Sequence, residues 1–386
     1  MTPAARLSAA IAVLDRVLGG TSAEQALTNW GRASRFAGSG DRHAVRDLVF
    51  GAIRCRRSFA ALGGDSGRGL ILGGLRAAGE DAGALFTGEG HAPAPLTPEE
   101  LTPVGALPEL VALDCPDWLA PALRASLGDD FAPVMQALRH RAPVFLRVNR
   151  TRLTITDAIA GLAAEGIAAQ PNALAKTALE VTGNARKIQQ SQAYVQGDIE
   201  LQDAASQAIV QALPLTPGQR VLDYCAGGGG KALAMAAEAA VTLFAHDADP
   251  RRMRDLPPRA ARAGVSLRLL TTVEVAEHAP YDLILADVPC SGSGSWRRAP
   301  EAKWALTPAR LTELGAIQAR ILDQIAPMVA ATGKLAYATC SLLAEENQSQ
   351  IASFLARTPG WQQLDCRRFT PLDGGDGFFL AVLSRN

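Results

Sequence analysis

The second half of the chain alternates short apolar runs with helix-length segments, and this alternation constrains the fold more than any other feature of the sequence. Continuous apolar runs joined by crossover helices are typical of a parallel sheet that is covered on both faces. The runs are RVLDYC (220–225), VTLFAHD (241–247), SLRLL (266–270), YDLILAD (281–287) and KLAYATC (334–340). Ligands of such sheets bind beyond the carboxyl ends of the strands, so the residues that end these runs are the candidate functional residues.

The first run leads directly into a glycine-rich turn, CAGGGGKA (225–232). Glycines between a strand and a helix let the backbone turn tightly and approach a ligand, and a helix start offers unpaired N–H groups. The spacing is not that of a Walker A loop. The turn therefore favours a nucleotide-like cofactor, with a purely structural turn as the alternative. The candidate cofactor-binding residues are Cys225, Ala226, Gly227, Gly228, Gly229, Gly230 and Lys231.

An acidic residue, Asp247, ends the second run about 20 residues after the glycines. A carboxylate in this position can accept hydrogen bonds from the two hydroxyls of a ribose. Asp249 is the rival candidate, and its simpler interpretation is a helix N-cap.

Two cysteines follow the fourth and fifth runs. Asp287 ends the fourth run, Cys290 comes after a turn that Pro289 stiffens, and Cys340 ends the fifth run. A lone cysteine is most often a small buried hydrophobe, but two thiols at neighbouring strand ends indicate a shared site. The six cysteines include no C-x-x-C pair, and with only five histidines the chain shows no zinc-ligand spacing, so we predict no metal. Free thiols are typical of the reducing cytoplasm, where we expect the protein.

The rest of the chain shows a division into parts. The length of 386 residues predicts two or three domains. The first 60 residues show helical periodicity, whereas residues 62–106 are rich in glycine, proline and acids and are interpreted as a weakly packed segment or linker. We therefore divide the chain into a helical part (1–138), a small α/β part (139–205) and the α/β sheet (206–386).

Charge is balanced overall and uneven locally. The 38 Lys and Arg against 38 Asp and Glu give a net charge of zero, which is no signature of nucleic-acid binding. Residues 31–60, however, hold seven arginines and two aspartates, and arginine-rich runs return at 139–152 and 251–268, while residues 80–130 are acidic. The total can therefore conceal an RNA-facing surface, with ordinary solvated helix faces as the alternative. No run of 18 apolar residues exists, so no membrane partner is predicted.

Several motifs together resemble those of the RNA 5-methylcytosine methyltransferases, in particular the RsmB branch that modifies small-subunit ribosomal RNA. They are VLDYCAGGGGKA, YDLILADVPCSGSG with WRRAPEAKW, and KLAYATCSLLAEEN, and the similarity extends over residues 140–386. The stretches SAEQAL (22–27) and DRHAVRDLVFGAIRCRR (41–57) are similar to the helical NusB-like RNA-binding domain of this branch. The resemblance implies a Rossmann-like class I methyltransferase sheet, S-adenosylmethionine as cofactor and small-subunit ribosomal RNA as substrate, and we expect a monomer.

The resemblance also implies a mechanism. In this family a thiolate adds to carbon 6 of cytosine, the resulting enamine takes the methyl group of S-adenosylmethionine at carbon 5, and a base removes the carbon-5 proton so that the thiol leaves. Cys340 in the TC dipeptide is then the expected nucleophile, and Cys290 in the PC dipeptide assists release of the product. Asp287 is expected to hydrogen-bond the flipped base and to border the cofactor, which the glycine loop and Asp247 hold.

Two departures from the family pattern concern the cofactor. Gly228 stands where the family usually has proline, which predicts a more mobile loop. The acid that contacts the adenine side in the family is missing from LLTTVEVAEH (269–278), which offers Thr271, Thr272 or Glu274 instead.

Some alternatives stay open. The PC cysteine could be the attacking thiol, as in the DNA-type arrangement. Lys231, Arg297 and Arg298 are candidates either for lowering a thiol pKa or for holding phosphate. The chain could also be an RNA-binding ribosome-assembly factor with a decayed methyltransferase domain, or a methyltransferase acting on tRNA or another substrate.

Overall fold

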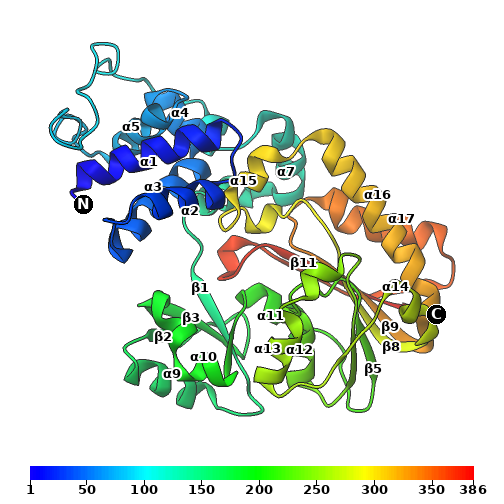
Figure 1. The fold of residues 1–386 in the computed structure, drawn as a ribbon. Coiled ribbons are helices and arrows are strands. Elements are labelled where there is room, and N and C mark those ends of the chain that lie inside the picture. Colours follow the sequence, from blue (N-terminus) through cyan, green and yellow to red (C-terminus); the bar gives the residue numbers. More distant parts are fainter. The chain divides into compact units, whose positions relative to one another are not determined.

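The structure is a computed structural model that describes residues 1–386, and it divides into two compact units. The first unit comprises Met1–Arg141 together with Trp296–Ala305, and the second comprises Ala142–Ser295 with Leu306–Asn386 (Figure 1). None of the helices combines the length and the hydropathy that a bilayer-spanning segment needs.

The first unit is helical, as predicted. The apolar faces of its first and third helices pack into one core, where Leu7, Leu14, Val45 and Val49 are all buried. Its helices are α1 (Pro3–Leu18), α2 (Ala23–Ala33), α3 (Ser39–Arg54), α4 (Arg56–Gly63), α5 (Gly67–Ala78), α6 (Glu109–Ala112), α7 (Ala120–Leu127), α8 (Phe131–Leu138) and α15 (Pro300–Ala305).

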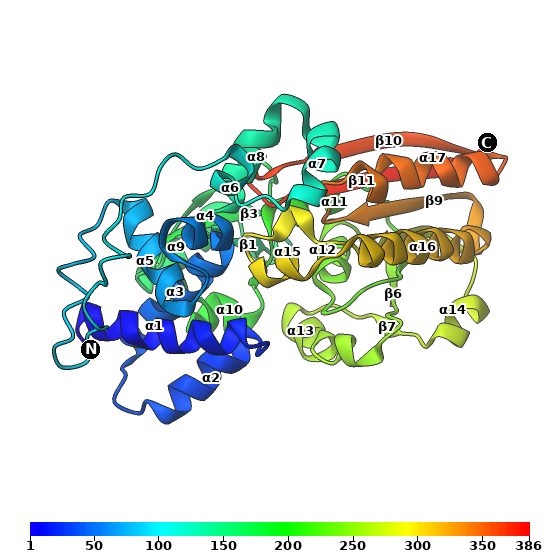
Figure 2. The ribbon, with the colours of Figure 1, turned by 90° about the horizontal axis from the view of Figure 1, so that it is seen from above.

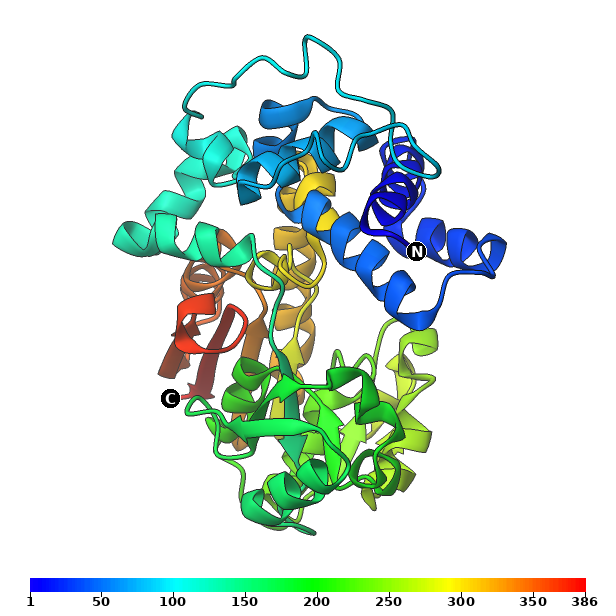
Figure 3. The ribbon, with the colours of Figure 1, turned by 90° about the vertical axis from the view of Figure 1, so that its left-hand side faces the viewer.

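The interpretation of residues 62–106 as weakly packed is wrong for α5. Leu70 and Leu72 of this helix are 1% and 0% exposed, and they belong to the core of the unit. The glycines that suggested a loop instead let α4 and α5 cross closely: a Cβ at Gly73 would lie 2.0 Å from the carbonyl oxygen of Phe59. The remainder, residues 79–108, forms neither a regular helix nor a strand (Figure 3).

The segment Trp296–Ala305 lies between two stretches of the second unit in the sequence but belongs to the first unit, where it packs against the end of α3. Lys303 Nζ donates to the carbonyl oxygen of Arg54 at 2.9 Å, and Trp304 Nε1 donates to that of Ile53 at 2.6 Å. These side chains satisfy carbonyl groups that a helix end leaves unpaired. Burial lowers the pKa of Lys303 to about 8.

The second unit begins with a small antiparallel sheet in the order β2-β3-β1-β4. Its strands are β1 (Val144–Val148), β2 (Ala168–Pro171), β3 (Ala178–Gly183) and β4 (Ile199–Leu201), accompanied by α9 (Ile155–Ala164) and α10 (Gln192–Gln196). The buried residues Leu146, Leu162 and Leu179 form a core of their own between sheet and helices.

The main sheet has seven strands in the order β10-β11-β9-β8-β5-β6-β7. The five predicted strands form its parallel part, and β11 joins it antiparallel to β9. The strands are β5 (Arg220–Asp223), β6 (Thr242–Ala245), β7 (Arg268–Leu269), β8 (Tyr281–Asp287), β9 (Val329–Thr339), β10 (Trp361–Phe369) and β11 (Phe378–Arg385). This arrangement confirms the predicted Rossmann-like class.

Helices cover both faces of the main sheet. Successive side chains of each strand point to opposite faces, so each strand contributes apolar residues to both layers. Val221 packs toward α11 and α12, whereas its neighbour Leu222 packs toward α16 and α17. Figure 2 shows α16 and α17 running along the sheet. The helices are α11 (Ala204–Gln211), α12 (Gly230–Glu238), α13 (Leu256–Ala263), α14 (Thr272–Glu277), α16 (Pro308–Ile325) and α17 (Gln348–Arg357).

Candidate active site

Two cysteine side chains meet where β8 and β9 end. The two strands are parallel neighbours in which Asp287 pairs with Ala338, so the turns that follow them emerge side by side. The Sγ atoms of Cys290 and Cys340 lie 3.4 Å apart, within hydrogen-bonding distance, and both thiols are free. The structure thus brings together the two cysteines that their strand-end positions singled out.

The surroundings of Cys290 oppose the ionisation of its thiol. The hydrogen bond with Cys340, burial, and the negative charges that Cys340 and Glu346 can carry raise the pKa of Cys290 well above its ordinary value. The raised pKa favours the protonated form of Cys290. Either sulfur can be the donor of the hydrogen bond between them.

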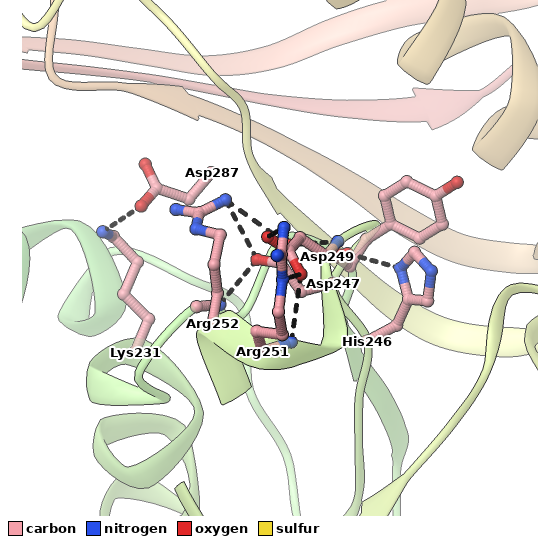
Figure 4. Close-up of polar contacts among 9 residues, drawn as sticks. Lys231, His246, Asp247, Asp249, Arg251, Arg252 and Asp287 are labelled. Carbon is pink, nitrogen blue, oxygen red and sulfur yellow. Dashed lines mark hydrogen bonds and ion pairs between the residues drawn. The ribbon is translucent and has the colours of Figure 1, made fainter. Parts of the chain in front are cut away.

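Asp287 is held by Lys231, which lies in the first turn of α12. The Nζ atom of Lys231 is 2.6 Å from Asp287 Oδ2 (Figure 4). It is 4.9 Å from the centre of the Phe378 ring. Burial opposes the charge of Lys231, but the carboxylates of Asp287 and Asp223 outweigh it and raise the pKa of Lys231. The lysine is thus a fixed positive charge bound to Asp287, and the negative charge that Cys340 can carry favours it as well.

Asp223, the last residue of β5, lies buried next to these groups. It is 1% exposed, and no donor reaches either carboxylate oxygen with hydrogen-bonding geometry. Burial raises the pKa of Asp223 to about 7. Lys231 and the backbone amide of Ala232 favour the charged carboxylate, but their effect is smaller than that of burial. Nothing in the sequence distinguished this aspartate from the rest of the strand.

The glycine loop turns as predicted and is tied to Asp247. Gly227 and Gly229 have φ angles of +49° and +77°, and a Cβ at Gly229 would lie 2.0 Å from Leu256. The carboxylate of Asp247 accepts a hydrogen bond from the Gly227 amide at 3.0 Å and forms an ion pair with Arg252 at 3.1 Å (Figure 4). A loop without side chains that joins a buried carboxylate fits a ribose-containing cofactor.

Asp249 takes the simpler role that the sequence offered for it. Its side chain caps the short helix Pro250–Met253 and pairs with Arg251 at 2.8 Å. Asp247 is 4% exposed, so it is the aspartate of this pair that is built into the site.

Arg259 of α13 holds the loop at the position where the family has proline. Its guanidinium donates to the carbonyl oxygen of Gly228 and also contacts Glu200 Oε2 at 3.0 Å. A Cβ at Gly228 would lie 3.1 Å from the same guanidinium. Glu200 belongs to β4 and is 3% exposed, so the small sheet holds the Arg259 side chain in place. A side chain thus restrains the loop for which the sequence predicted greater mobility.

The three residues offered in place of the missing acid are used in different ways. Thr271 and Glu274 form a capping box at the start of α14, in which the Glu274 carboxylate accepts from the Thr271 amide at 2.8 Å. The Thr272 hydroxyl lies 3.0 Å from Nε2 of His246, whose Nδ1 is 2.7 Å from the Tyr224 carbonyl oxygen. His246 precedes Asp247 at the end of β6, and that position was the signal that could have identified it.

The remaining basic candidates belong to the first unit. Arg297 and Arg298 lie in the segment that packs with the first unit, and the Arg297 carbonyl oxygen accepts a hydrogen bond from Arg54 at 2.7 Å. Of the predicted basic candidates, Lys231 is the one that the second unit places beside Asp287. The described residues contain no cluster of three or more His, Cys, Asp or Glu side chains that could hold a metal ion.

The chain is similar in sequence to known proteins. The family described as 16S rRNA methyltransferase RsmB/F matches residues 210–384, and the ferredoxin-like domain of RsmF/B-like methyltransferases matches residues 115–187. The ribosomal RNA small subunit methyltransferase B of Xanthomonas campestris pv. campestris is 34% identical over 288 residues. That alignment covers 69% of this chain and 66% of the relative.

Solved structures show the same fold. The crystal structure of PH0851 covers 100% of this chain and 99% of its own, with a TM-score of 0.80 at 22% identity. A methyltransferase homolog from Pyrococcus horikoshii covers 75% of this chain and 100% of its own, with a TM-score of 0.64 at 25% identity. The sequence matches show that the chain belongs to the family described as 16S rRNA methyltransferase RsmB/F.

Proposed function

We propose that this protein methylates carbon 5 of a cytosine in small-subunit ribosomal RNA through a covalent bond between Cys340 and the base. The observation that carries the proposal is the 3.4 Å contact between the sulfurs of Cys290 and Cys340 at neighbouring strand ends. One thiol can add to the pyrimidine ring while a second, protonated thiol serves the later release of the product. Methyl transfer to an oxygen or nitrogen nucleophile has no need for this pair.

Each residue of the site has a role in this proposal. When bound, S-adenosylmethionine supplies the methyl group that carbon 5 receives, and the glycine loop with Asp247 would hold it. The Cys340 sulfur bonds to carbon 6, which makes carbon 5 electron-rich. Asp287, held by Lys231 at 2.6 Å, hydrogen-bonds the polar edge of the cytosine. Cys290 assists the departure of the Cys340 sulfur once carbon 5 has lost its proton.

The test is covalent trapping on small-subunit ribosomal RNA that contains 5-azacytidine. We expect an adduct with the wild-type protein, none with Cys340→Ala, and an unchanged adduct with Cys366→Ala, because Cys366 is exposed on β10. An adduct that survives Cys340→Ala and vanishes in Cys290→Ala would reverse the two roles. Isothermal titration calorimetry adds a separate check, since an assembly factor with a decayed site would not bind S-adenosylmethionine.

A second surface supports an RNA substrate. In the first unit, Arg32, Arg35 and Arg42 are exposed around the turn between α2 and α3, and none has a carboxylate partner. Phe36 in the same turn is 76% exposed, so cations and an aromatic face lie together. Arginines bind phosphates and an exposed ring stacks on unpaired bases. We propose that this NusB-like part of the chain, predicted over residues 1–138, binds single-stranded RNA.

That surface is tested by replacing Arg32 and Arg35 together with alanine. Affinity for RNA should fall by about tenfold or more at low salt and depend less steeply on salt, because phosphate contacts are lost. Arg254→Ala is the control, since Arg254 is 84% exposed but paired with Asp255. Equal affinities for the double variant and the control would contradict the assignment.

A further inference from the structure

A buried carboxylate lies behind the two thiols. Glu346, at the end of the short helix Ala344–Glu346, is 1% exposed. Four hydrogen bonds from neutral donors reach its side chain: the Ser291 amide at 2.8 Å, the hydroxyls of Ser291 and Ser341 at 2.5 Å each, and Gln318 Nε2 at 3.0 Å. These donors satisfy the hydrogen-bonding capacity of the buried carboxylate.

These contacts fasten both cysteine-bearing turns to one group. Ser291 directly follows Cys290, and Ser341 directly follows Cys340. The two serine hydroxyls share the same carboxylate oxygen, Oε2 of Glu346, and Gln318 reaches from α16 to both Glu346 and the Pro289 carbonyl oxygen. Moving either turn would break a charge-assisted hydrogen bond, so the carboxylate fixes the separation of the two sulfurs.

The charge of Glu346 also acts on the thiols. It is among the causes that raise the pKa of Cys290, after the hydrogen bond with Cys340, burial and the charge of Cys340. The other titratable group near Cys290 is Tyr337 of β9, whose hydroxyl donates to the Glu346 carbonyl oxygen at 2.6 Å and whose own pKa is raised by burial. Lys231 interacts with Cys340 instead.

We propose that Glu346 is a positioning residue for the thiol pair: its side chain holds the Cys290 and Cys340 turns in contact and keeps the shared proton on Cys290. The inference rests on the proposed function, in which Cys340 attacks and Cys290 assists release. It adds a group that touches neither base nor cofactor and decides which thiol is the nucleophile.

The test compares Glu346→Gln with Glu345→Gln. Glu345 is exposed in the same turn and is the matched control. In a Cys340→Ala background, the rate of alkylation of Cys290 by iodoacetamide is followed against pH by peptide mass spectrometry. We expect Glu346→Gln to shift the midpoint of this profile to lower pH and to raise the rate at about pH 8 by roughly tenfold. A turn that is merely loosened would react faster at every pH with an unmoved midpoint, and that result would overturn the proposal.

Glu346→Asp separates the tether from the charge and covers the case in which the glutamine variant does not fold. It keeps the charge on a shorter side chain, so the Cys290 midpoint should stay where it is while trapping on azacytidine RNA slows by about tenfold. Binding of S-adenosylmethionine should be unchanged in all three variants. If the wild type forms no adduct, the proposed function fails. If it forms one and Glu346→Asp traps RNA at the wild-type rate, only the role of Glu346 fails.

Discussion

Replacing Asp223 by asparagine should stabilise the folded chain at neutral and alkaline pH but not at acidic pH. Burial raises the pKa of Asp223 from 3.8 to about 7. Because the folded-state pKa lies above the unfolded value, the contribution of this group to stability is full below the unfolded pKa and is lost as the pH rises through the folded pKa. The loss amounts to about 4 kcal/mol once both states are ionised. Asparagine is neutral at every pH and suffers no such loss.

The assay is urea unfolding of both proteins over a series of pH values. The unfolding free energy of Asp223→Asn minus that of the wild type should rise by about 1.4 kcal/mol per pH unit from about pH 4 to 7 and then level off. Asp255→Asn is the control, because the side chain of Asp255 is 72% exposed and should give a flat difference. A flat difference for Asp223→Asn as well would refute the burial argument.

Two further predictions concern glycine packing and the cofactor loop. Gly73→Ala should lower the unfolding free energy by about 3 kcal/mol, because its Cβ would meet a backbone oxygen of α4 at 2.0 Å. Gly51→Ala in α3, with no atom within 4 Å, should be neutral or stabilising by up to about 1 kcal/mol. Urea unfolding measures both, and equal effects would contradict the packing argument. Arg259→Ala should weaken binding of S-adenosylmethionine by about fivefold in calorimetry, since it frees the Gly228 carbonyl, whereas Arg254→Ala should not. An unchanged Kd for Arg259→Ala would show that the contact of Arg259 with the Gly228 carbonyl does not contribute to cofactor binding.

How much of the fold was predictable depended on how directly each element shows in a local pattern. The five parallel strands are continuous apolar runs because they are covered on both faces, so the sequence marks them clearly. β10 is an edge strand whose residues Gln362, Gln363 and Leu364 are exposed, and no apolar run marks it. α5 was mistaken for a loop because glycines serve turns and close helix crossings alike, and only the partner helix tells the two apart.

The site divides in the same way. Asp247, Asp287, Cys290 and Cys340 follow strands, and the geometry of a parallel sheet brings strand ends together without further information. Arg259 reaches the loop from a helix whose position depends on the buried Glu200 of another sheet, and that contact joins residues 59 positions apart. Such side chains are placed by tertiary packing, which a single sequence does not reveal.

The sequence left two interpretations of the arginine-rich runs, an RNA-facing surface or ordinary solvated helix faces. The structure shows a third use, because many of these arginines form ion pairs within the protein. All six arginines of the run 251–268 form ion pairs with carboxylates, two of them with the buried Glu200. In the run 139–152, Arg139 pairs with the fully buried Asp114, and Arg147 is itself 4% exposed. Arg139, Arg147 and the two arginines that pair with Glu200 are therefore structural, and a charge run in the sequence overstates the surface available to phosphate. At the turn between α2 and α3, exposed arginines without a carboxylate partner lie together, so an RNA-binding defect should follow from changes there.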